Sequence, residues 1–581
     1  MHHLLSKFLI TVVLSFSLAT NASGPTDRPM LPVGFNNVKV SGELYERVVQ
    51  NMSRLEDERY RPDRVFLTEQ QSGYWPGDTE GRTVLGLIMD AQASGRKPAY
   101  LNDIIRRIPE HLNELGYFGT IHRDSLDEQQ LSGNGWVLRA LCEYYRWKKD
   151  DSVLPVIRSI SENLFLAGHN LFDSYPVNPD DRTASRGGAS GNVSGTIGRW
   201  RVSTDIGCVF IGMDGLIQAY EITRNKKLKP VIDNLIALFL KVDPVKIKAQ
   251  THATLTAMRG LIRYAGITGD NRYIEKAAER WDTYKQYGMT ENYANYNWFC
   301  RYNTWTEPCA IVDSYIVATQ LWQHTGKEAY RDDAELIYYN ALCHGQRYNG
   351  GFGTDTCPGI ASGHDHISVS AYEAYWCCTM RGGEGLGRAV EYSAFVRGNN
   401  VALPYYRNAA ISVPIGKKER LCLEETTDYP FGGKVNIHVT GAPSHKITLS
   451  LAHARWMENF TVSINGSIVT TTMANGMETL TRKFAPGDRI EVCFTMTPHT
   501  ETTINADNNM TDHYKILYGP LLLAAPDACK QGIQRPEEFQ SLGNCKYRPV
   551  GSNVILSPLY HLMRQEVNRT GTPIYGRRII F

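Results

Sequence analysis

Amphipathic segments separated by short polar turns recur along residues 40–390, and this repeat constrains the fold more than any other feature. An apolar run with helical periodicity precedes each turn, and another follows it. Helical hairpins that recur roughly every 45–75 residues are typical of stacked or ring-closed helix pairs. Five turns, with one further pair unrecognised, favour an (α/α)6 toroid over an open solenoid. These turns lie at residues 93–97, 148–152, 223–227, 268–272 and 325–329.

The sequence pattern changes after about residue 398. Apolar and polar positions then alternate in segments such as 435–439 and 489–494, and Asn465-Gly466 supplies a turn, which indicates a β-sandwich. We therefore predict a multidomain α + β protein. Its expected parts are a signal peptide (1–22), an (α/α)6 toroid catalytic domain (23–398), a β-sandwich (399–528) and an irregular C-terminal extension (529–581).

The first residues have the organisation of a secretory signal peptide. A short basic segment precedes an apolar segment of 12 residues, Phe8 to Ala19, and small residues at Ala19 and Ala22 offer cleavage points. Twelve apolar residues are too few to span a membrane. We therefore expect an exported protein, periplasmic or secreted, with no membrane insertion.

The charge balance gives no support for nucleic-acid binding. The chain has 62 Lys and Arg against 60 Asp and Glu, a formal net charge of +2, and it has no long basic run. Its 12 cysteines are scattered. In an oxidising compartment Cys529 and Cys545 are the pair that we most readily expect to be bridged. Nothing in the sequence indicates an oligomeric state.

Candidate chemistry is concentrated in Cys377-Cys378 and in Glu307-Pro308-Cys309. Adjacent cysteines bridge each other only with strain, but their thiolates can bind one soft metal ion. Glu307 and Cys309 lie two positions apart, so they point the same way on an extended segment. The four residues make a set that suits tetrahedral zinc. From the residues alone, buried thiols or disulfides to other partners are an equally good interpretation, since the spacing matches no zinc-finger pattern.

This ordered set resembles glycoside hydrolase family 127, the β-L-arabinofuranosidase-like proteins. In that family a glutamate is followed about sixteen residues later by Glu-x-Cys, and then about seventy residues later by Cys-Cys. The matching positions here are Glu291, Glu307 with Cys309, and Cys377-Cys378. Further similarity covers residues 75–86, the helical segment that begins at Gly215, and residues 427–435.

The resemblance implies a zinc-dependent retaining glycosidase on an (α/α)6 barrel followed by a β-sandwich. Glu307, Cys309, Cys377 and Cys378 would hold one Zn²⁺ ion. Cys377 would also be the nucleophile, because zinc coordination deprotonates a thiol. Glu291 would be the general acid and then the base of a double displacement that retains configuration.

The implied substrate is an oligosaccharide of plant pectin that ends in L-arabinofuranose or a related furanose. Relatives carry histidines where this chain has Phe210 and Asn134-Gly135-Trp136, and these departures put arabinofuranose itself in question. Some relatives act on an acidic branched deoxysugar such as aceric acid, whose carboxylate an arginine could bind. Candidate sugar contacts are His252, Tyr375 and Trp75, and further candidates near the site are Arg301, Arg381 and His344.

Two other functions fit a helical toroid. One is a polysaccharide lyase or a metal-free inverting hydrolase in which the cysteines are incidental. The other is a glycan-binding protein with a structural zinc ion. Zinc content, an unsaturated uronate product and hydrolysis of a glycan panel distinguish these readings, because fold alone does not set function.

Overall fold

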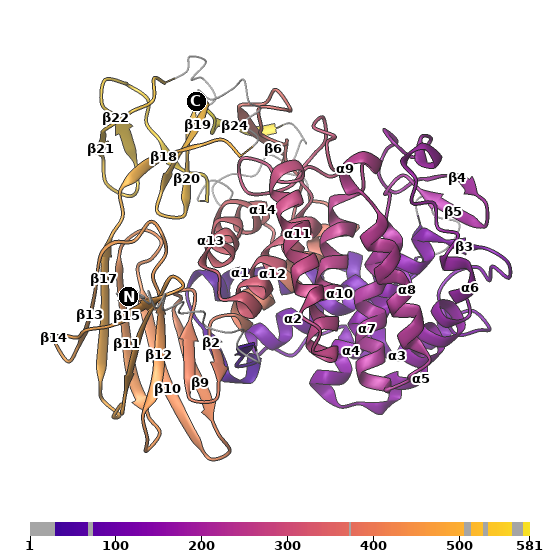
Figure 1. The fold of residues 1–581 in the computed structure, drawn as a ribbon, viewed down its shortest axis with the longest axis horizontal. Helices are drawn as coiled ribbons and strands as arrows, with labels where there is room; N and C mark the ends of the chain where they lie inside the picture. The colour runs from indigo at the N-terminus through magenta and orange to yellow at the C-terminus, as the bar shows by residue number, and fades with distance from the viewer. Residues whose placement is uncertain (1–28, 68–73, 371–372, 505–512, 527–532, 561–572) are drawn as a thin grey trace, which may run out of the picture.

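The computed structural model describes residues 29–67, 74–370, 373–504, 513–526, 533–560 and 573–581. Most β-strands lie on one side of the molecule and the helical region on the other, with a separate three-stranded sheet at the outer edge of the helical region (Figure 1). Within the described residues, no helix combines the length and apolarity needed to cross a bilayer. The predicted signal peptide and Cys529 lie outside these residues.

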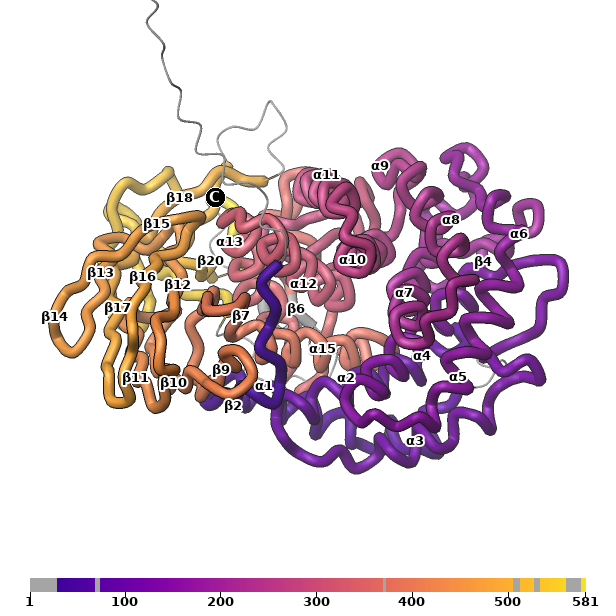
Figure 2. Tube along the Cα trace, turned by 60° about the horizontal axis from the view of Figure 1, so that its bottom comes forward, coloured from indigo at the N-terminus to yellow at the C-terminus, as the bar shows by residue number. Residues whose placement is uncertain are grey.

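Six helices form the inner ring of a toroid. Each packs against the next, and the last returns to the first, so the ring is closed (Figure 2). Almost every residue of α2 and α12 is buried, as expected for helices enclosed on all sides. The inner helices are α2 (Asp78–Ser94), α4 (Glu128–Lys148), α7 (Ile211–Thr223), α10 (Thr251–Thr268), α12 (Pro308–Thr325) and α15 (Cys378–Glu391).

The outer helices explain why the sequence contains five recognisable turns. Each turn connects an inner helix to the outer helix that follows it. The sixth pair has no turn, because α1, the first helix, packs against α15, the last. The prediction of an (α/α)6 toroid is therefore confirmed. The outer helices are α1 (Glu43–Leu55), α3 (Leu101–Arg107), α5 (Leu154–Ser159, continued by Ile160–Leu166), α8 (Leu228–Lys241), α11 (Arg272–Tyr287) and α13 (Glu328–Ile337).

Local sequence signals mark the ends of the inner helices. Asp127 caps the start of α4 by accepting hydrogen bonds from the backbone N–H groups of Gln129 and Gln130. α10 and α12 end at Gly269 and Gly326, whose φ angles of 75° and 70° are left-handed and favour glycine. Short helices fill the connections: α6 (His169–Phe172), α9 (Pro244–Ile247) and α14 (Cys343–Gly345).

Two facing sheets follow the toroid and confirm the predicted β-sandwich. Strand β9 alternates buried and partly exposed residues, as a strand with one face in a core must. The first sheet runs β1 (Leu31–Pro32), β7 (Phe395–Arg397), β8 (Asn400–Leu403), β12 (Ile447–Ala452), β16 (Met477–Arg482), β15 (Thr472–Ala474). The second runs β14 (Ser467–Ile468), β13 (Glu458–Ile464), β17 (Arg489–Thr495), β11 (Lys434–Gly441), β10 (Glu419–Thr427), β9 (Ala409–Ile415), β2 (Val38–Val40). Strands β1, β2 and β7 precede residue 398, yet they pair with sandwich strands.

A third sheet occupies the stretch after the sandwich, including part of the segment that we expected to be irregular. It joins β18 (Pro498–Thr502), β19 (Tyr514–Tyr518), β20 (Leu521–Pro526), β24 (Pro573–Arg578) and β6 (His366–Ser370), and β23 (Ser557–Pro558) pairs with β20. A separate hairpin holds β21 (Phe539–Ser541) and β22 (Tyr547–Pro549). Strands β23 and β24 pair with partners distant in sequence and so leave no local signal in the segment that we expected to be irregular.

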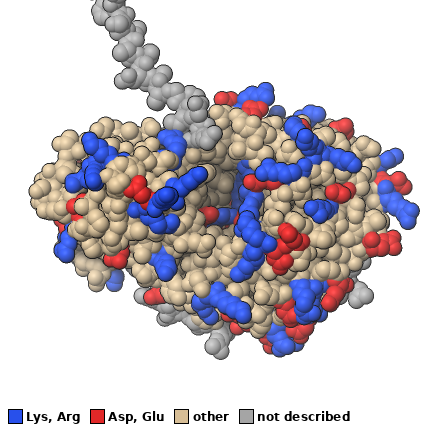
Figure 3. All heavy atoms as spheres, turned by 90° about the horizontal axis from the view of Figure 1, so that it is seen from below, with Lys and Arg blue, Asp and Glu red and all other residues tan. Residues whose placement is uncertain are grey.

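The glycine-rich insertion at residues 184–200 is also anchored by strands. It contributes β4 (Val193–Ile197) and the first residue of β5 (Trp200–Ser203), and β5 pairs with β3 (Leu126–Asp127) just before α4. Charged side chains of both signs are interspersed over the face in Figure 3, which is hollowed near its centre. That mixture agrees with the small net charge of +2.

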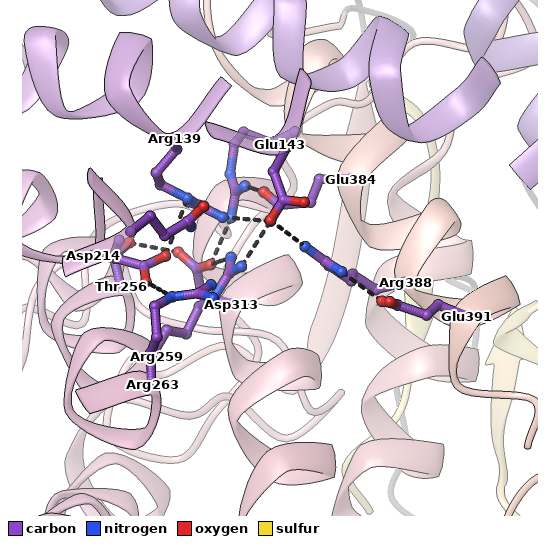
Figure 4. Close-up of polar contacts among 12 residues, drawn as sticks. Arg139, Glu143, Asp214, Thr256, Arg259, Arg263, Asp313, Glu384, Arg388 and Glu391 are labelled. Carbon is purple, nitrogen blue, oxygen red and sulfur yellow. Dashed lines mark hydrogen bonds and ion pairs between the residues drawn. The ribbon is translucent and has the colours of Figure 1, made fainter. Parts of the chain in front are cut away.

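A buried network of charges fills the middle of the toroid (Figure 4). Arg259 of α10 lies 2.6 Å from Asp313 of α12 and 2.7 Å from Glu384 of α15. The three arginines Arg139, Arg259 and Arg381 are matched by the three carboxylates Asp214, Asp313 and Glu384, all 1% exposed or less. Removing one partner would leave a buried charge unpaired, which is strongly destabilising. The network therefore holds five inner helices in a fixed relative position.

Close contact between inner helices predicts that a single methyl group is disruptive at Gly215. A Cβ atom there would lie 2.3 Å from the carbonyl oxygen of Gly135 in α4. We expect Gly215→Ala to destabilise the protein by about 1–3 kcal/mol through overpacking. The matched control is Gly266→Ala in α10, where nothing lies within 4 Å. It should stabilise by about 0.4–1 kcal/mol. Thermal unfolding midpoints measure both, and an unchanged midpoint for Gly215→Ala contradicts the packing.

Candidate active site

A cavity of about 710 Å³ opens at the end of the toroid where the inner helices begin. The N-terminal ends of five inner helices contribute to its wall, through Asp78 of α2, Ile211 of α7, His252 of α10, Glu307 before α12, and Cys378 of α15. The N-terminus of a helix carries partial positive charge. The toroid therefore directs several positive helix ends at one cavity, which favours anionic groups there.

Three cysteine sulfurs cluster at the cavity wall: Cys377 and Cys378 line the cavity, and Cys309 is buried beside them. The Sγ atoms of Cys377 and Cys378 lie 3.3 Å apart, and those of Cys309 and Cys378 lie 3.7 Å apart. In a tetrahedral zinc site with Zn–S bonds of about 2.3 Å, the sulfurs lie about 3.8 Å from each other. The spacing of the three thiols is therefore close to that of a zinc site.

The local structure explains how cysteines from two motifs meet. Pro308 is the first residue of α12, where it needs no hydrogen-bond partner, and it places Cys309 in the first turn. Cys378 begins α15, and the carbonyl oxygen of Ala374 accepts hydrogen bonds from the N–H groups of Cys377 and Cys378. Because α12 and α15 are neighbours in the ring, their N-termini bring the two motifs together.

Without a cation the three thiols share negative charge unequally. Burial opposes ionisation of Cys309, but hydrogen bonds from Cys377 and Cys378 and the nearby Arg82 hold its pKa well below the usual range. Arg82 donates a hydrogen bond to Cys309 Sγ at 3.3 Å. Hydrogen bonds to Cys309 and Cys378 raise the pKa of the Cys377 thiol, with burial adding to the shift. One thiolate therefore suppresses ionisation of its neighbour.

Glu307 completes a donor set that fits a metal ion. Its carboxylate, His252 and Cys309 present donor atoms within 4.8 Å of one another, as do the three cysteines. Among the described residues, Glu307 Oε2 is buried and has no hydrogen-bond partner. Burial raises the pKa of Glu307 well above its usual value, and the charge of Cys309 adds to this. A dication would satisfy the orphaned oxygen and the crowded thiols together, so these residues fit zinc.

His252 connects the cavity to the buried charge network. Its Nδ1 lies 3.6 Å from Glu307 Oε1, and its Nε2 lies 3.4 Å from Asp313 Oδ2. Burial lowers the pKa of His252 although Asp313 opposes the shift, which favours the neutral imidazole. Its ring also stacks on Trp136, with centroids 5.8 Å apart. His252 is therefore held rigidly at the cavity wall.

Two other predicted sugar contacts also line the cavity. Trp75 is half-buried, and its Nε1 donates a hydrogen bond to the Gly191 carbonyl at 3.2 Å. Tyr375 is 37% exposed, and the Arg59 guanidinium lies 3.4 Å from the centre of its ring. Both positions suit contact with a bound sugar.

Glu291 lies elsewhere in this structure. Its side chain is fully buried, and it is not one of the residues that line the cavity. Its Oε2 lies 3.3 Å from Lys515 Nζ and accepts a hydrogen bond from the Ile504 N–H at 2.9 Å. Both partners come from the region after the sandwich. The structure therefore does not bring Glu291 to the three sulfurs.

Most other positions singled out from the sequence lie in the core, whereas Arg301 is half-buried. Phe210 packs edge-on against Tyr175 and Phe239, and Trp136 is fully buried. Arg301 stacks over Trp298, whereas His344 is buried within 3.8 Å of Asp355. Arg381 belongs to the charge network. None of these side chains lines the cavity.

Several cavity residues were not predicted from the sequence. Asp78 and Arg82 carried a usable signal, because they lie four positions apart at the start of a helix and form an ion pair at 2.8 Å. Burial raises the pKa of Asp205 to about 6, although hydrogen bonds from Gly191 and Ser190 oppose the shift. Only the fold places Asp205 here. The remaining unpredicted residues include Arg59, Arg64, Gln250, Asn297, Trp305 and Trp376.

Comparison with known proteins agrees with this architecture. A solved β-arabinofuranosidase of glycoside hydrolase family 127 has a TM-score of 0.69 and 16% identity, covering 95% of this chain and 98% of its own. A family 127 β-L-arabinofuranosidase from Geobacillus stearothermophilus T6 has a TM-score of 0.65 and 12% identity, covering 94% and 99%. At these identities the likeness shows the fold. No curated protein sequence matches the chain significantly.

Family models identify the two main parts of the chain. Residues 211–389 match the model described as the β-L-arabinofuranosidase GH127 catalytic domain. Residues 402–496 match the model described as the GH127 middle domain. The first match contains Glu291, Glu307, Cys309 and the Cys377-Cys378 pair. With the toroid, the sandwich and the ordered motif in place, residues 211–389 and 402–496 are identified as the catalytic and middle domains of glycoside hydrolase family 127, and the protein is a glycoside hydrolase.

Proposed function

We propose that this protein is an exported, retaining exo-glycosidase that removes a terminal L-arabinofuranose or related furanose from plant pectic glycan. The observation that carries the proposal is the convergence of Cys309, Cys377 and Cys378 with Glu307 at one cavity. The volume of about 710 Å³ is in the range of small-ligand sites. Membership of family 127 supports the sugar class.

The proposed cofactor is Zn²⁺, held by Glu307, Cys309, Cys377 and Cys378. When bound, it would keep the thiols ionised at neutral pH, which the metal-free cluster does not do for Cys377. His252 lies within reach of the same set and would orient Glu307.

Cys377 is the proposed nucleophile because it is the most accessible of the three sulfurs. Cys377 and Cys378 both line the cavity, but Cys378 is buried, as is Cys309, whereas Cys377 is half-buried. Its sulfur attacks the anomeric carbon, the bond to the leaving oxygen breaks, and that oxygen takes a proton from an acid. Water then attacks the same carbon and displaces the sulfur, which restores the original configuration.

The acid and base of this reaction are proposed to be Glu291, from its place in the family pattern. Catalytic contacts are often formed only when substrate is bound. Glu291 therefore stays a candidate for the acid and base although it lies beside Lys515 in this structure. Asp205 is the competing carboxyl group. It lines the cavity, and burial raises its pKa to about 6, a value suited to an acid near neutral pH.

An acidic sugar is a second candidate substrate. Three arginines line the cavity, Arg59, Arg64 and Arg82, and an arginine can bind a carboxylate through two hydrogen bonds. Arg82 is held in a buried pair with Asp78, whereas Arg64 shares an exposed ion pair with Glu58 at 3.0 Å and Arg59 lies over the Tyr375 ring. Because an exposed ion pair contributes little free energy, Arg59 and Arg64 can turn toward such a group more readily than Arg82. A branched acidic deoxysugar such as aceric acid would use them.

The function predicts which sugar is released and which thiol is required. Incubation with arabinan and pectic oligosaccharides should release L-arabinose, identified by chromatography of the monosaccharides. Cys377→Ser should reduce turnover at least about 1,000-fold, because serine at neutral pH is a far weaker nucleophile. The control is Cys493→Ser in the sandwich, which should keep normal turnover. Release of an acidic deoxysugar instead of L-arabinose favours the second candidate substrate. A Cys377→Ser variant that stays active contradicts the assignment of Cys377 as the nucleophile.

The donor set predicts one zinc ion per chain. Elemental analysis of the purified protein should find about one equivalent, and Cys309→Ser should lower it. Metal binding to the folded state should raise the midpoint of thermal unfolding, and chelation should lower it. The Cys493→Ser variant should bind metal normally. A protein that contains no zinc and is insensitive to chelation contradicts the proposed centre.

The choice of acid predicts a dependence on the leaving group. Glu291→Gln should lower kcat about 100-fold or more on a sugar leaving group, within the range that acid catalysis contributes. It should have little effect on glycosylation from a 2,4-dinitrophenyl glycoside, whose leaving group needs no proton. Pre-steady-state kinetics measure that step. Asp205→Asn is the comparison variant. If Asp205→Asn, and not Glu291→Gln, loses activity only on the sugar leaving group, then Asp205 is the general acid.

A further inference from the structure

Two exposed tryptophans lie at the rim of the active-site cavity. The chain has 10 tryptophans, all within the described residues, and only Trp305 and Trp376 are exposed, at 37% and 57%. Both line the cavity. Large apolar surface left in water at the edge of a cavity is typical of a binding site rather than of folding.

Neighbouring rings hold these two side chains in place. Trp305 contacts the buried Trp298 edge-on, with centroids 5.6 Å apart, and its backbone pairs with Thr356. Trp376 contacts Tyr375 edge-on at 4.9 Å. Tyr60 donates a hydrogen bond to the Tyr375 carbonyl at 2.8 Å. The two indoles are therefore supported by ordered neighbours, which lowers the cost of ordering them around a ligand.

The two tryptophans are adjacent to the predicted catalytic motifs. Trp376 immediately precedes Cys377, and Trp305 lies two positions before Glu307. The reacting bond of a glycoside at Cys377 separates the sugar in the cavity from the leaving sugar outside it. A ring attached across that bond would emerge at the rim, where an indole offers a flat apolar surface to the C–H face of a pyranose.

We infer that Trp376 and Trp305 form a binding subsite for the leaving group, and that its ligand is a pyranose ring of the glycan. This inference rests on the proposed exo-glycosidase function. The subsite makes the enzyme select glycosides attached to a sugar over those attached to a small alcohol. Trp376, as the more exposed of the two and the closer in sequence to Cys377, supplies most of the selection.

Two substrates with the same terminal sugar test the subsite. One is a β-L-arabinofuranosyl galactopyranoside and the other is methyl β-L-arabinofuranoside. Trp376→Ala should raise KM for the first about tenfold, a typical loss when an aromatic contact is removed. It should leave kcat/KM for the second within about twofold. Trp376→Phe keeps an aromatic face and should restore most of the loss.

The control variant is Ile468→Ala, which removes an exposed apolar side chain in β14, remote in sequence from the motifs. It should leave both substrates unaffected. Equal losses on both substrates in Trp376→Ala would show damage to Cys377 and overturn the inference. An unchanged KM for the galactopyranoside overturns it as well. So does a dimer that dissociates when Trp305 and Trp376 are both replaced, because a second copy of the chain would then cover the rim.

A binding measurement separates this inference from the choice of terminal sugar. If neither glycoside is hydrolysed, the proposed arabinofuranose specificity fails, and the subsite is tested by titration. Methyl β-D-galactopyranoside should change the intrinsic tryptophan fluorescence of the wild type. Galactitol, which has no ring face, should not, and Trp376→Ala should abolish the change. No response to the galactopyranoside overturns the subsite.

Discussion

Mutual repulsion among three sulfurs is the constraint on which this active site depends. Cys309, Cys377 and Cys378 lie too close together to ionise independently. Hydrogen bonds from Cys377 and Cys378, together with Arg82, stabilise the thiolate of Cys309, and burial and that charge then hold protons on the other two sulfurs. A bound dication would remove this conflict, because it would neutralise the sulfur cluster and give the buried oxygen of Glu307 a partner.

The closed ring of helices makes this arrangement possible. Parallel inner helices all begin at one end, so the first turns of α12 and α15 meet even though their motifs lie far apart in sequence. Behind the cavity, equal numbers of buried arginines and carboxylates link the helices, and Asp313 carries that linkage to His252. The geometry of the cavity is thus set by charges that are not themselves exposed to substrate.

Strands that follow the sandwich hold segments of the toroid that lie close in sequence to the active-site motifs. Strand β6 belongs to the segment before Cys377 but pairs with β24 at the far C-terminus, and Lys515 of β19 binds Glu291. The loops that surround the cavity are therefore tied to strands that follow the sandwich. The same loops determine which carboxyl group is positioned to act as the acid. Asp205 lines the cavity, whereas Glu291 points toward the residues that follow the sandwich.

The sequence by itself determined the features that have local signatures. Helical periodicity and polar turns predicted the toroid, and alternation predicted the sandwich. Spacing alone left the role of Glu307, Cys309 and Cys377-Cys378 open, and only their resemblance to family 127 grouped them. Tertiary structure alone decided the rest. Phe210 is in the core, Trp376 is at the rim, and β24 pairs with β6, because burial and long-range pairing depend on which segments the ring closure brings together. The type and spacing of residues do not show which distant segments will pack around a side chain.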